Sequence, residues 1–561
     1  MTSFDEGVTQ ERHYPVVVVG GGPVGLAVAG DLGWRGNRCL LVERGTGNVN
    51  QPKMDLVGVR TMEFCRRWGL VPAVEAAPYP RDVPQDYIYL TSLRGFELSR
   101  EPFPSKDQEP CPPQSPQKRE RCPQHMFDPI MARFAASFPT VELRYETQLE
   151  SLVETESHVE LVLRNVRTGH EKTIRADYVV GADGGDSTVR KALSIGMSGS
   201  GTLTYTTNVL IRADLDPLHD KGRGYRYIFV GPEGTWLTIT STNGRDEWRV
   251  QFIGDAAPSK PSPEQVREAL FRAVGCEFDY DIIDVMPWVR RELVAEHYGT
   301  RRCFLAGDSA HLMSPTGAFG MNTGMQDAVD IGWKLDAVLK GWGGPGLLLS
   351  YEQERRPVAL RNVAEATGNL RRMLETRKRR PPPEVFQDGE RAAAVRKEYG
   401  EWYADLLRQE WFTIGINLGY RYDDSCVICY DASPRPPLTV STYEQTTLPG
   451  ARAPHAWLAP GRSTLDAFGR GFTLVRSGPD APPADPFAAA AARLGIPFSV
   501  LDIADPDICR LYERKLVLVR PDGHVGWRGH LVPAQPEAIF DTLRGASASQ
   551  TRREPIAEGA T

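Results

Sequence analysis

The stretch that most constrains this chain is the glycine-rich sequence GGGPVG, which follows an apolar run at 14–19. Residues 14–44 have the pattern of a strand, a turn, a helix and a second strand, the start of a βαβ unit. In a G-x-G-x-x-G turn, the first glycine (Gly20) permits the tight turn. The second (Gly22) lets a pyrophosphate approach the backbone, and the third (Gly25) allows close packing of the helix on the strand. The stretch therefore predicts a dinucleotide-binding site.

Three further residues of this unit fit the same site. Pro23 and Val24 begin the helix, whose free N–H groups and partial positive charge attract phosphates. Glu43 ends the second strand, at about the spacing where an acidic residue takes the ribose hydroxyls. The pattern predicts a dinucleotide without distinguishing FAD from NAD.

A second motif lies in YVVGADGGDSTVRKAL, where the strand at 178–181 ends in Asp183-Gly184. Ser187 and Arg190 follow a few residues later. An Asp-Gly pair after a strand is usually only a turn, so this motif carries little weight by itself.

A third motif, GDSAHLMSPTGAFGMNTG, occupies residues 307–324. Asp308 follows Gly307 at the end of an apolar strand, where a carboxylate can accept hydrogen bonds from a sugar alcohol. Gly320 leaves room for close approach, and Asn322 offers a cap-like side chain at the start of a helix near Met321. If the ligand is a flavin, that helix end faces its pyrimidine edge, where reduced flavin is negatively charged. His311 is assigned no catalytic role.

Residues 200–295 alternate between polar and apolar positions and are rich in aromatic and β-branched residues. Turn sequences at 232–234 and 243–244 divide them, which predicts an antiparallel sheet inserted between two α/β segments. The Pro- and charge-rich segment 103–121 is predicted to be a long surface loop. A helical pattern extends from 321 to about 375, and residues 440–545 predict β-α-β followed by a hairpin at Asp522-Gly523.

The composition excludes several classes of function. The 561 residues carry a net charge of −6 without a basic face, which argues against nucleic-acid binding. No apolar stretch is long enough to span a bilayer, and the polar N-terminus is not a signal peptide. Nine scattered cysteines fit a reducing, cytoplasmic compartment. The C-x-x-C at 426–429 reads as part of a strand, and no metal site is expected.

The order and spacing of the three motifs resemble the single-component FAD-dependent aromatic hydroxylases. The segments RTMEFCRRWG, RCPQHMFDP, YEQERRPVA, PGARAPHAWL and LVRPDGHVGWRG resemble the phenol hydroxylase branch, as in 2,4-dichlorophenol monooxygenase. The flavin hydroxylases of indolocarbazole biosynthesis are especially similar. The resemblance covers nearly the whole chain. It implies an α/β fold, with a Rossmann-like FAD-binding domain, an inserted antiparallel-sheet substrate domain and a C-terminal thioredoxin-like domain.

The resemblance divides the chain into an FAD-binding part at 1–199, with an excursion to the substrate domain near 80–120, and the substrate domain at 200–295. A second FAD-binding part with a helical segment follows at 296–430. The thioredoxin-like domain occupies 431–545, and a disordered tail is expected at 546–561. Because the last domain lacks a redox C-x-x-C, its implied role is structural or dimer-supporting. A homodimer or higher homo-oligomer remains open.

The resemblance also assigns residues to the cofactor. The first motif would hold the ADP part of FAD, and the Asp-Gly motif with Arg190 would serve FAD and the pyridine nucleotide. Asp308 would take the ribityl chain, and the following segment would lie against the flavin ring. Gln124 matches a glutamine that contacts FAD, and Arg44 lies where relatives place a flavin-contacting residue. The full cofactor set is Gly20, Gly22, Pro23, Val24, Gly25, Glu43, Arg44, Gln124, Asp183, Gly184, Arg190, Gly307, Asp308, Pro315, Gly320, Met321 and Asn322.

Asp55 lies where phenol hydroxylases have an aspartate proposed to deprotonate the substrate. A carboxylate in a semi-apolar pocket would have its pKa raised toward that of a useful base. The alternative is a surface or capping aspartate before a helix at 59–68. Substrate-pocket candidates on the inserted sheet are Tyr225, Tyr227, Trp236 and Arg249, although alternation places about half of such residues on the outer face.

The resemblance implies an enzyme that uses FAD, NADH or NADPH, and O₂ to hydroxylate a phenolic or phenol-like aromatic, such as an antibiotic or other natural-product intermediate. Oxygen would react through a flavin C4a-hydroperoxide. Two alternatives remain: a Baeyer–Villiger or oxidatively decarboxylating monooxygenase on the same scaffold, and a non-catalytic flavin-binding protein.

Overall fold

The computed structural model describes residues 13–255, 257 and 260–546. The chain forms two compact units. The first comprises residues up to 328 with 358–419 and 438–443, and the second comprises 329–357, 420–437 and the chain from 444 onward. Most of the predicted C-terminal tail lies outside the described residues.

A mostly parallel sheet forms one half of the first unit. It has the strand order β7-β2-β1-β10-β9-β8, with β16 paired to β10. The strands are β1 (His13–Val19), β2 (Cys39–Val42), β7 (Val141–Arg144), β8 (Thr147–Glu154), β9 (Val159–Asn165), β10 (Glu171–Gly181) and β16 (Cys303–Leu305). The predicted βαβ unit is confirmed, because α1 (Pro23–Trp34) joins β1 to the parallel strand β2. The C-terminal ends of β1, β10 and β16 lie side by side, so the three predicted motifs meet at one edge of this sheet.

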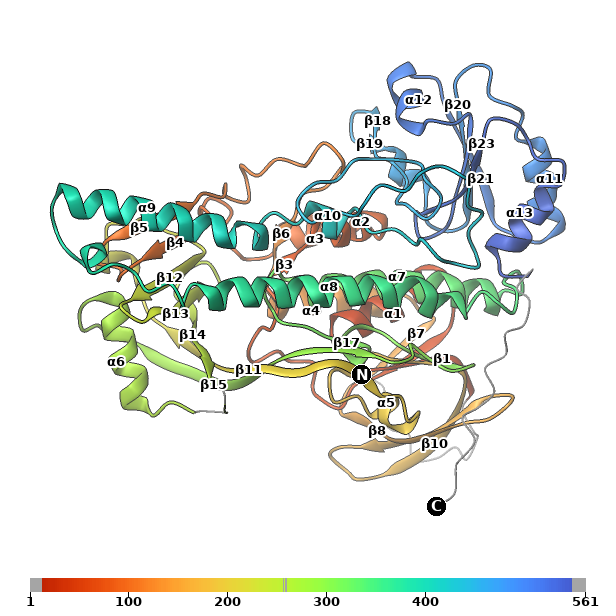
Figure 1. Cartoon of the computed structure of the whole chain (residues 1–561). Helices are drawn as coiled ribbons and strands as arrows, with labels where there is room; N and C mark the ends of the chain where they lie inside the picture. Colours follow the sequence, from red (N-terminus) through yellow and green to blue (C-terminus); the bar gives the residue numbers. More distant parts are fainter. Residues whose placement is uncertain (1–12, 256, 258–259, 547–561) are drawn as a thin grey trace. The chain divides into compact units, whose positions relative to one another are not determined.

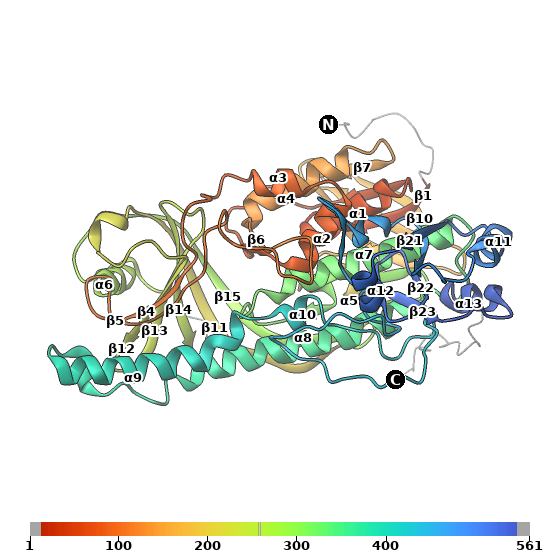
Figure 2. The ribbon, with the colours of Figure 1, turned by 90° about the horizontal axis from the view of Figure 1, so that it is seen from above.

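A second sheet of the first unit has the order β17-β15-β11-β14-β13-β12-β4-β5. Its strands are β4 (Tyr87–Leu90), β5 (Glu97–Glu101), β11 (Met197–Arg212), β12 (Arg226–Gly231), β13 (Gly234–Ser241), β14 (Glu247–Asp255), β15 (Asp281–Ala295) and β17 (His311–Leu312). All neighbours are antiparallel except β4 and β12. Figures 1 and 2 show α6 (Pro263–Val274) and α9 (Glu390–Leu407) on opposite faces of this sheet.

The two faces of this sheet differ in chemistry because side chains alternate along each strand. The face under α6 is an apolar core that includes Val209, Ile239 and Val250, together with Leu270 of the helix. The opposite face is mixed: it is apolar where β4 and β12 pack against α9, and elsewhere it carries polar residues, many of which line a cavity. The second sheet therefore supplies a polar wall to the interior of the first unit.

The remaining elements before residue 420 are short, except for two long helices that each have residues in both units. They are β3 (Leu56–Val57), β6 (Glu120–Arg121), α2 (Val59–Arg67), α3 (Val71–Glu75), α4 (Gln124–Ala136), α5 (Thr188–Ala192), α7 (Phe319–Leu339), α8 (Ser350–Glu375) and α10 (Ile414–Asn417), with 3-10 turns at Asp216–Leu218, Gly307–Ser309, Pro383–Phe386 and Arg408–Glu410. The predicted helical stretch from 321 to 375 is two helices, because the glycine-rich sequence GWGGPG separates them.

The segment 103–121 is not a simple surface loop. Lys106 and Glu120 form a buried ion pair with an N–O distance of 3.0 Å. Ser115, also buried, donates a hydrogen bond to Glu63 over 2.6 Å. Charged residues are tolerated inside because they are paired, which composition alone does not reveal.

The second unit contains a four-stranded sheet with the order β21-β20-β22-β23. Its elements are β18 (Trp457–Ala459), β19 (Arg462–Ser463), the 3-10 turn Thr464–Ala467, β20 (Phe472–Ser477), α11 (Asp485–Arg493), β21 (Phe498–Ile503), α12 (Pro506–Tyr512), β22 (Leu516–Val519), β23 (Val525–Gly529) and α13 (Pro536–Leu543). The predicted β-α-β and the hairpin at Asp522-Gly523 are confirmed. The predicted strand at 425–430 is wrong: these residues form turns, and all nine cysteines are free thiols.

A buried ionic cluster lies within the second unit. The carboxylates of Asp330, Glu354 and Asp522 have oxygens within 4.8 Å of one another. Lys334 contacts Asp330 and Glu354 over 2.7 and 2.6 Å, and Arg520 contacts Glu354 and Asp522 over 2.5 and 2.7 Å. These two cations compensate the carboxylates, so the cluster reads as an internal ion network of this unit.

Within the described residues, no helix is long and apolar enough to cross a membrane.

Candidate functional site

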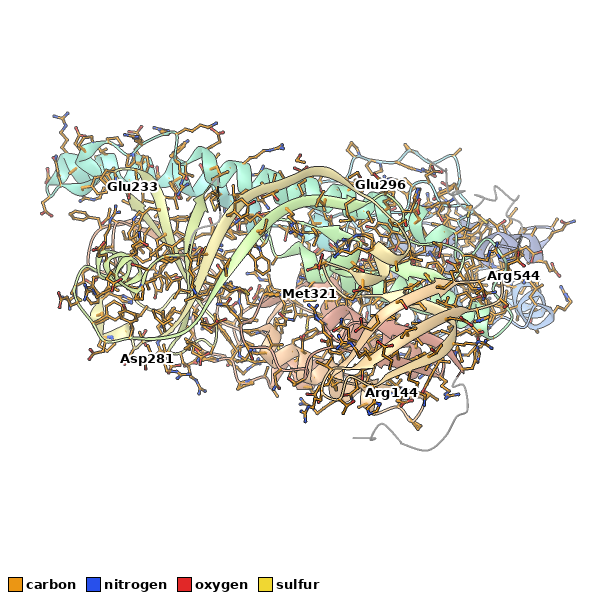
Figure 3. All side chains as sticks on the ribbon, turned by 90° about the horizontal axis from the view of Figure 1, so that it is seen from below. Arg144, Glu233, Asp281, Glu296, Met321 and Arg544 are labelled. Carbon is orange, nitrogen blue, oxygen red and sulfur yellow. The ribbon has the colours of Figure 1, made fainter. Side chains whose placement is uncertain are left out.

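A single large cavity of about 1160 Å³ opens between the two sheets of the first unit. It exceeds the roughly 300–1,000 Å³ of a typical small-ligand pocket, so it has room for more than one ligand. Figure 3 shows Met321, at the start of α7, in the region between the strands of the two sheets. The predicted residues that line the cavity are Gly20, Gly22, Pro23, Val24, Glu43, Arg44, Asp55, Gln124, Asp183, Gly184, Tyr225, Arg249, Asp308, Pro315, Gly320, Met321 and Asn322.

The glycine-rich turn forms an open cradle at the edge of the parallel sheet. Gly20 has a φ of 110°, and a Cβ there would meet the Ala182 carbonyl oxygen at 2.3 Å. Gly22 precedes the first turn of α1 in an extended conformation, and a Cβ added to it would meet nothing within 4 Å. The turn therefore leaves space beside the helix N-terminus, where a phosphate group fits.

We expect Gly22→Ala to fold normally but to bind FAD at least about tenfold more weakly, because the new methyl group occupies space that the protein leaves free for the cofactor. Gly25→Ala is the matched comparison. Its Cβ would lie 2.0 Å from the Gly20 carbonyl oxygen, so it should instead lower the thermal stability of the apoprotein. Apoprotein melting and FAD titration separate the two effects. Equal FAD affinity in Gly22→Ala and wild type would contradict the cradle.

Three predicted cofactor residues do not line the cavity. Gly25 provides the close helix–strand contact described above. Gly307 has a φ of 61° and packs against Val24. Arg190 is buried and donates hydrogen bonds to the carbonyl oxygens of Ser309 and Gly185, both over 3.1 Å. These three residues stabilise the turns that line the cavity without lining it themselves.

Glu43 lines the cavity, but its two oxygens already accept backbone hydrogen bonds. They receive the N–H groups of Gly21 and Gly45, each over 2.7 Å. The carboxylate is thus held at the end of β2, where Glu43 lines the cavity and can accept further hydrogen bonds.

Asp183 is engaged by the protein as well. It accepts hydrogen bonds from the Ser187 hydroxyl over 2.5 Å and from the Thr188 N–H over 2.7 Å, at the start of α5. The Ser309 hydroxyl also donates to it, over 3.0 Å. Asp183 therefore ties the second motif to the third, which chain order alone could not show.

Asp308 follows β16, and its side chain is exposed only because it faces the cavity. Burial of its surroundings raises the pKa of this carboxyl, against the opposing effect of His311 and Lys53. His311 itself contacts Asp327 over 2.8 Å, and Asp327 also accepts the Gly307 N–H over 3.1 Å. The buried pair of His311 and Asp327 holds the turn that carries Asp308 in place. His311 therefore has a structural role.

Asn322 joins the start of α7 to the segment around β3. Its side-chain oxygen accepts hydrogen bonds from the Gly58 N–H over 2.8 Å and the Thr61 hydroxyl over 2.7 Å. Its amide donates to the carbonyl oxygen of Leu56 over 3.1 Å. The helix N-terminus that faces the cavity is thereby locked to the segment that carries Asp55.

Gln124 starts α4 and lines the cavity beside Lys53. Its oxygen accepts the Lys53 N–H, and its amide donates to Asp128, both over 3.0 Å. Burial raises the pKa of Asp128 to about 7. Gln124 therefore positions the chain near Lys53 in addition to facing the cavity.

Asp55 lies in a buried cluster with two arginines and a tyrosine. Its carboxylate is 3.2 Å from Arg121 and 3.1 Å from Arg249, and it accepts a short hydrogen bond from the Tyr225 hydroxyl. The Arg121 guanidinium also stacks over the Tyr225 ring, 3.5 Å from its centre. Asp55 is thus neither a surface residue nor a simple helix cap.

The expected rise of the Asp55 pKa is wrong. Burial alone raises it, but the charges of Arg121 and Arg249 and the hydrogen bond from Tyr225 lower the pKa below its usual value. Burial also raises the pKa of the Tyr225 hydroxyl well above its usual value. Asp55 therefore remains a carboxylate, and Tyr225 keeps its proton.

Two of the predicted substrate residues do not face the cavity. Tyr227 is fully buried in the apolar core under α6, and its hydroxyl donates to the Gly222 carbonyl oxygen over 3.2 Å. Trp236 packs against the same core, with the Arg272 guanidinium 4.0 Å from its ring centre. Tyr227 lies on the outward side of the strand alternation, and Trp236 lies at a register shift between β12 and β13.

Seven cationic residues of the cavity wall are absent from the predicted site: Lys53, Lys118, Arg119, Arg121, Arg226, Arg290 and Arg291. The signal was present as polar residues at alternate positions of β13 and β14, such as Thr238 with Thr240, which mark the inward polar face.

Two family models match most of the chain. Residues 13–366 match the model described as FAD binding domain, and residues 446–547 match the model described as aromatic-ring hydroxylase, C-terminal.

Individual proteins match along nearly their whole length. The chain is 33% identical to a putative polyketide hydroxylase of Streptomyces halstedii, over 95% of this chain and 96% of the relative. It is 30% identical to phenol 2-monooxygenase of Pseudomonas sp. (strain EST1001), over 97% and 95%. Chromopyrrolic acid-soaked RebC with bound 7-carboxy-K252c has a similar structure, with a TM-score of 0.89 and 35% identity over 96% of this chain and 100% of that one.

Proposed function

This chain belongs to the FAD-dependent aromatic-ring hydroxylases, and on that premise we propose that it inserts one oxygen atom into a phenolic or phenol-like aromatic in its cavity. One observation carries the proposal. A single cavity is bounded on one side by the three predicted cofactor motifs and on the other by the polar face of the eight-stranded sheet. A cofactor and an aromatic substrate can therefore meet in one enclosed space.

The residues on the cofactor side fit FAD. The space beside Gly22 suits a pyrophosphate, Glu43 suits the ribose, and Asp308 presents a carboxylate to the ribityl hydroxyls. Gly320 and Met321 lie at the N-terminus of α7, which suits the flavin ring. When bound, FAD supplies the redox chemistry, taking two electrons from NADH or NADPH and activating O₂. One oxygen atom enters the ring and the other leaves as water.

On the substrate side, Asp55 and Arg121 hold Tyr225 in place. Because Asp55 accepts the Tyr225 proton in a hydrogen bond, the Tyr225 oxygen keeps lone pairs with which it can accept a bond from a ring hydroxyl of the substrate. Arg249 would stabilise the phenolate that forms when that hydroxyl releases its proton to water. A more negative ring is more nucleophilic, which favours its hydroxylation. Asp55 acts here as a positioning carboxylate rather than as a base with a raised pKa.

We extend the proposal to the other parts of the chain. The eight-stranded sheet would act as the substrate domain. The order of the four-stranded sheet, with β20 parallel to β21 and antiparallel to β22, supports a thioredoxin-like arrangement in the second unit. Since that unit has no C-x-x-C within its sheet, its role would be structural, including support of a homo-oligomer.

A direct test is a screen of phenols and polycyclic phenols against the FAD-loaded protein. We expect a subset to stimulate NADH or NADPH oxidation several-fold above the basal rate and to yield a product with a new ring hydroxyl. A product with an inserted ester oxygen or a lost carboxyl group would instead support the alternative oxygenations. A protein that neither binds FAD nor responds to any compound would contradict the proposal.

A further inference from the structure

Three arginines project from one face of the eight-stranded sheet into the cavity. Arg226 on β12 is opposite Thr240 on β13, which is opposite Arg249 on β14. Residues directly opposite each other share a face of the sheet, so the two arginines lie on the same side. Arg290 on β15 reaches this side too, because it donates to the Thr206 hydroxyl of β11 over 3.2 Å. All three arginines line the cavity.

Arg249 already has a carboxylate partner within the protein. Asp55 is the carboxylate within 3.1 Å of it, and the same carboxylate also pairs with the buried Arg121 over 3.2 Å. One negative charge therefore serves two guanidinium groups, and none is left for the other arginines of this wall.

Arg290 has only neutral partners in the described part of the chain. Its side chain is 1% exposed, and it donates to the hydroxyls of Thr206 and Ser314 and to the Gln251 oxygen, over 3.2 to 3.3 Å. A guanidinium has five N–H groups. These three hydrogen bonds therefore orient the side chain and leave other N–H groups that can donate to a ligand. A buried cation with no carboxylate within ion-pair distance among the described residues is costly, and its position in a cavity wall points to a ligand that supplies the charge.

Arg226 is also incompletely neutralised. Its nearest carboxylate is Glu410, which is 3.7 Å away and is itself buried. The buried Arg226 Nε has no hydrogen-bond partner among the described residues. Burial raises the pKa of Glu410 and the charges of Arg226 and Arg290 oppose this rise, so one carboxyl faces two arginines.

We propose that the substrate carries a carboxylate in addition to its ring hydroxyl, and that Arg290 and Arg226 bind this carboxylate. The planar guanidinium matches a carboxylate with two parallel hydrogen bonds, and the interaction is strengthened by the enclosed surroundings. The ring hydroxyl faces Tyr225, so a second anionic group is needed to satisfy Arg290. This inference rests on the proposed function, because it specifies the substrate class of the same cavity.

The probes for the test are 1-hydroxy-2-naphthoate and its neutral methyl ester, titrated separately into the FAD-loaded full chain at neutral pH. Binding is followed by the change in flavin absorbance. We expect the acid to bind the wild type at least about tenfold more tightly than the ester, since only the acid forms charge-assisted hydrogen bonds with the arginines. Arg290→Met should remove this preference and leave the affinity for the ester within about twofold.

Two further variants serve as controls for the loss of charge and for its position. Arg290→Lys keeps the charge and should retain part of the preference for the acid. Arg212→Gln removes one positive charge from an exposed position of the same sheet and should leave both affinities unchanged. The flavin content of each variant reports whether it has folded.

Equal affinity of the wild type for acid and ester, including failure to bind either, would overturn the carboxylate site, as would parallel weakening of both by Arg290→Met. The outcome is distinguishable from failure of the proposed function. If the acid is preferred but no phenol stimulates NAD(P)H oxidation, the carboxylate site stands and the hydroxylase activity does not. If neutral phenols are hydroxylated without any preference for acids, only the carboxylate site fails.

Discussion

Replacing Asp308 with alanine is expected to give a folded protein that is purified without bound FAD. The carboxylate faces the cavity from the turn after β16, and the buried pair of His311 and Asp327 fixes that turn from the other side. Alanine removes the acceptor while leaving this support intact. Loss of a hydrogen bond to a charged group costs about 1.5–3 kcal/mol, which corresponds to a roughly 10- to 150-fold loss of FAD affinity. The ratio of flavin to protein absorbance after purification, and FAD titration of the apoprotein, measure the effect.

Asp220→Ala is the matched control, because Asp220 belongs to the same unit and its side chain is 87% exposed. It should retain FAD as well as the wild type does. Asp308→Asn should fall between the two, since an amide oxygen still accepts a hydrogen bond but carries no charge. A yellow, fully loaded Asp308→Ala protein would refute the assignment of Asp308 to the ribityl chain.

Replacing Asp55 with asparagine is expected to lower the rate of hydroxylation by about 100-fold or more, because the groups that position the substrate hydroxyl lose their anchor. Arg121 and Arg249 would be left without their shared negative charge, and Tyr225 would donate to a neutral amide oxygen in place of a carboxylate. Removing one partner of a buried ion pair typically costs about 3–5 kcal/mol of stability. The measurements are single-turnover hydroxylation and thermal melting, with flavin content as the check that the cofactor remains bound.

The pH dependence separates positioning from general-base catalysis by Asp55. Its pKa is lowered in the folded protein, so its contribution to stability is present above the unfolded pKa of about 3.9 and is lost as the pH falls below it. We therefore expect Asp55→Asn to reduce hydroxylation by the same factor from about pH 5 to pH 8. An acid limb in the wild-type profile near neutral pH that disappears in Asp55→Asn would restore Asp55 as the base.

The cofactor side of the cavity could be predicted from the sequence because its signals are local. The glycine turn, its strand and its helix lie within 14–44, and the observed elements match the predicted bounds within a residue or two. Asp308 is predictable for the same reason, since it follows an apolar strand closely in the chain. Local backbone requirements leave a readable pattern in consecutive residues.

The substrate side could not be predicted to the same depth. The cluster around Asp55 joins residues from the segment after β2, from β6 and from β14, and only the folded sheets bring them together. The sign of the Asp55 pKa shift depends on Arg121 and Arg249, which lie 66 and 194 residues away in the chain. Strand alternation was recognised, but without the register it could not show which tyrosine faces inward.

The most direct test of the account is the origin of the oxygen in the product. The FAD-loaded protein is incubated with NADH or NADPH, ¹⁸O₂ and a phenol that stimulates cofactor oxidation, and the product is analysed by mass spectrometry. We predict a gain of one ¹⁸O atom on a ring carbon, with the flavin required and no label taken from H₂¹⁸O. A product without ¹⁸O from O₂, or label in a position other than a ring hydroxyl, would contradict the assignment as an aromatic hydroxylase.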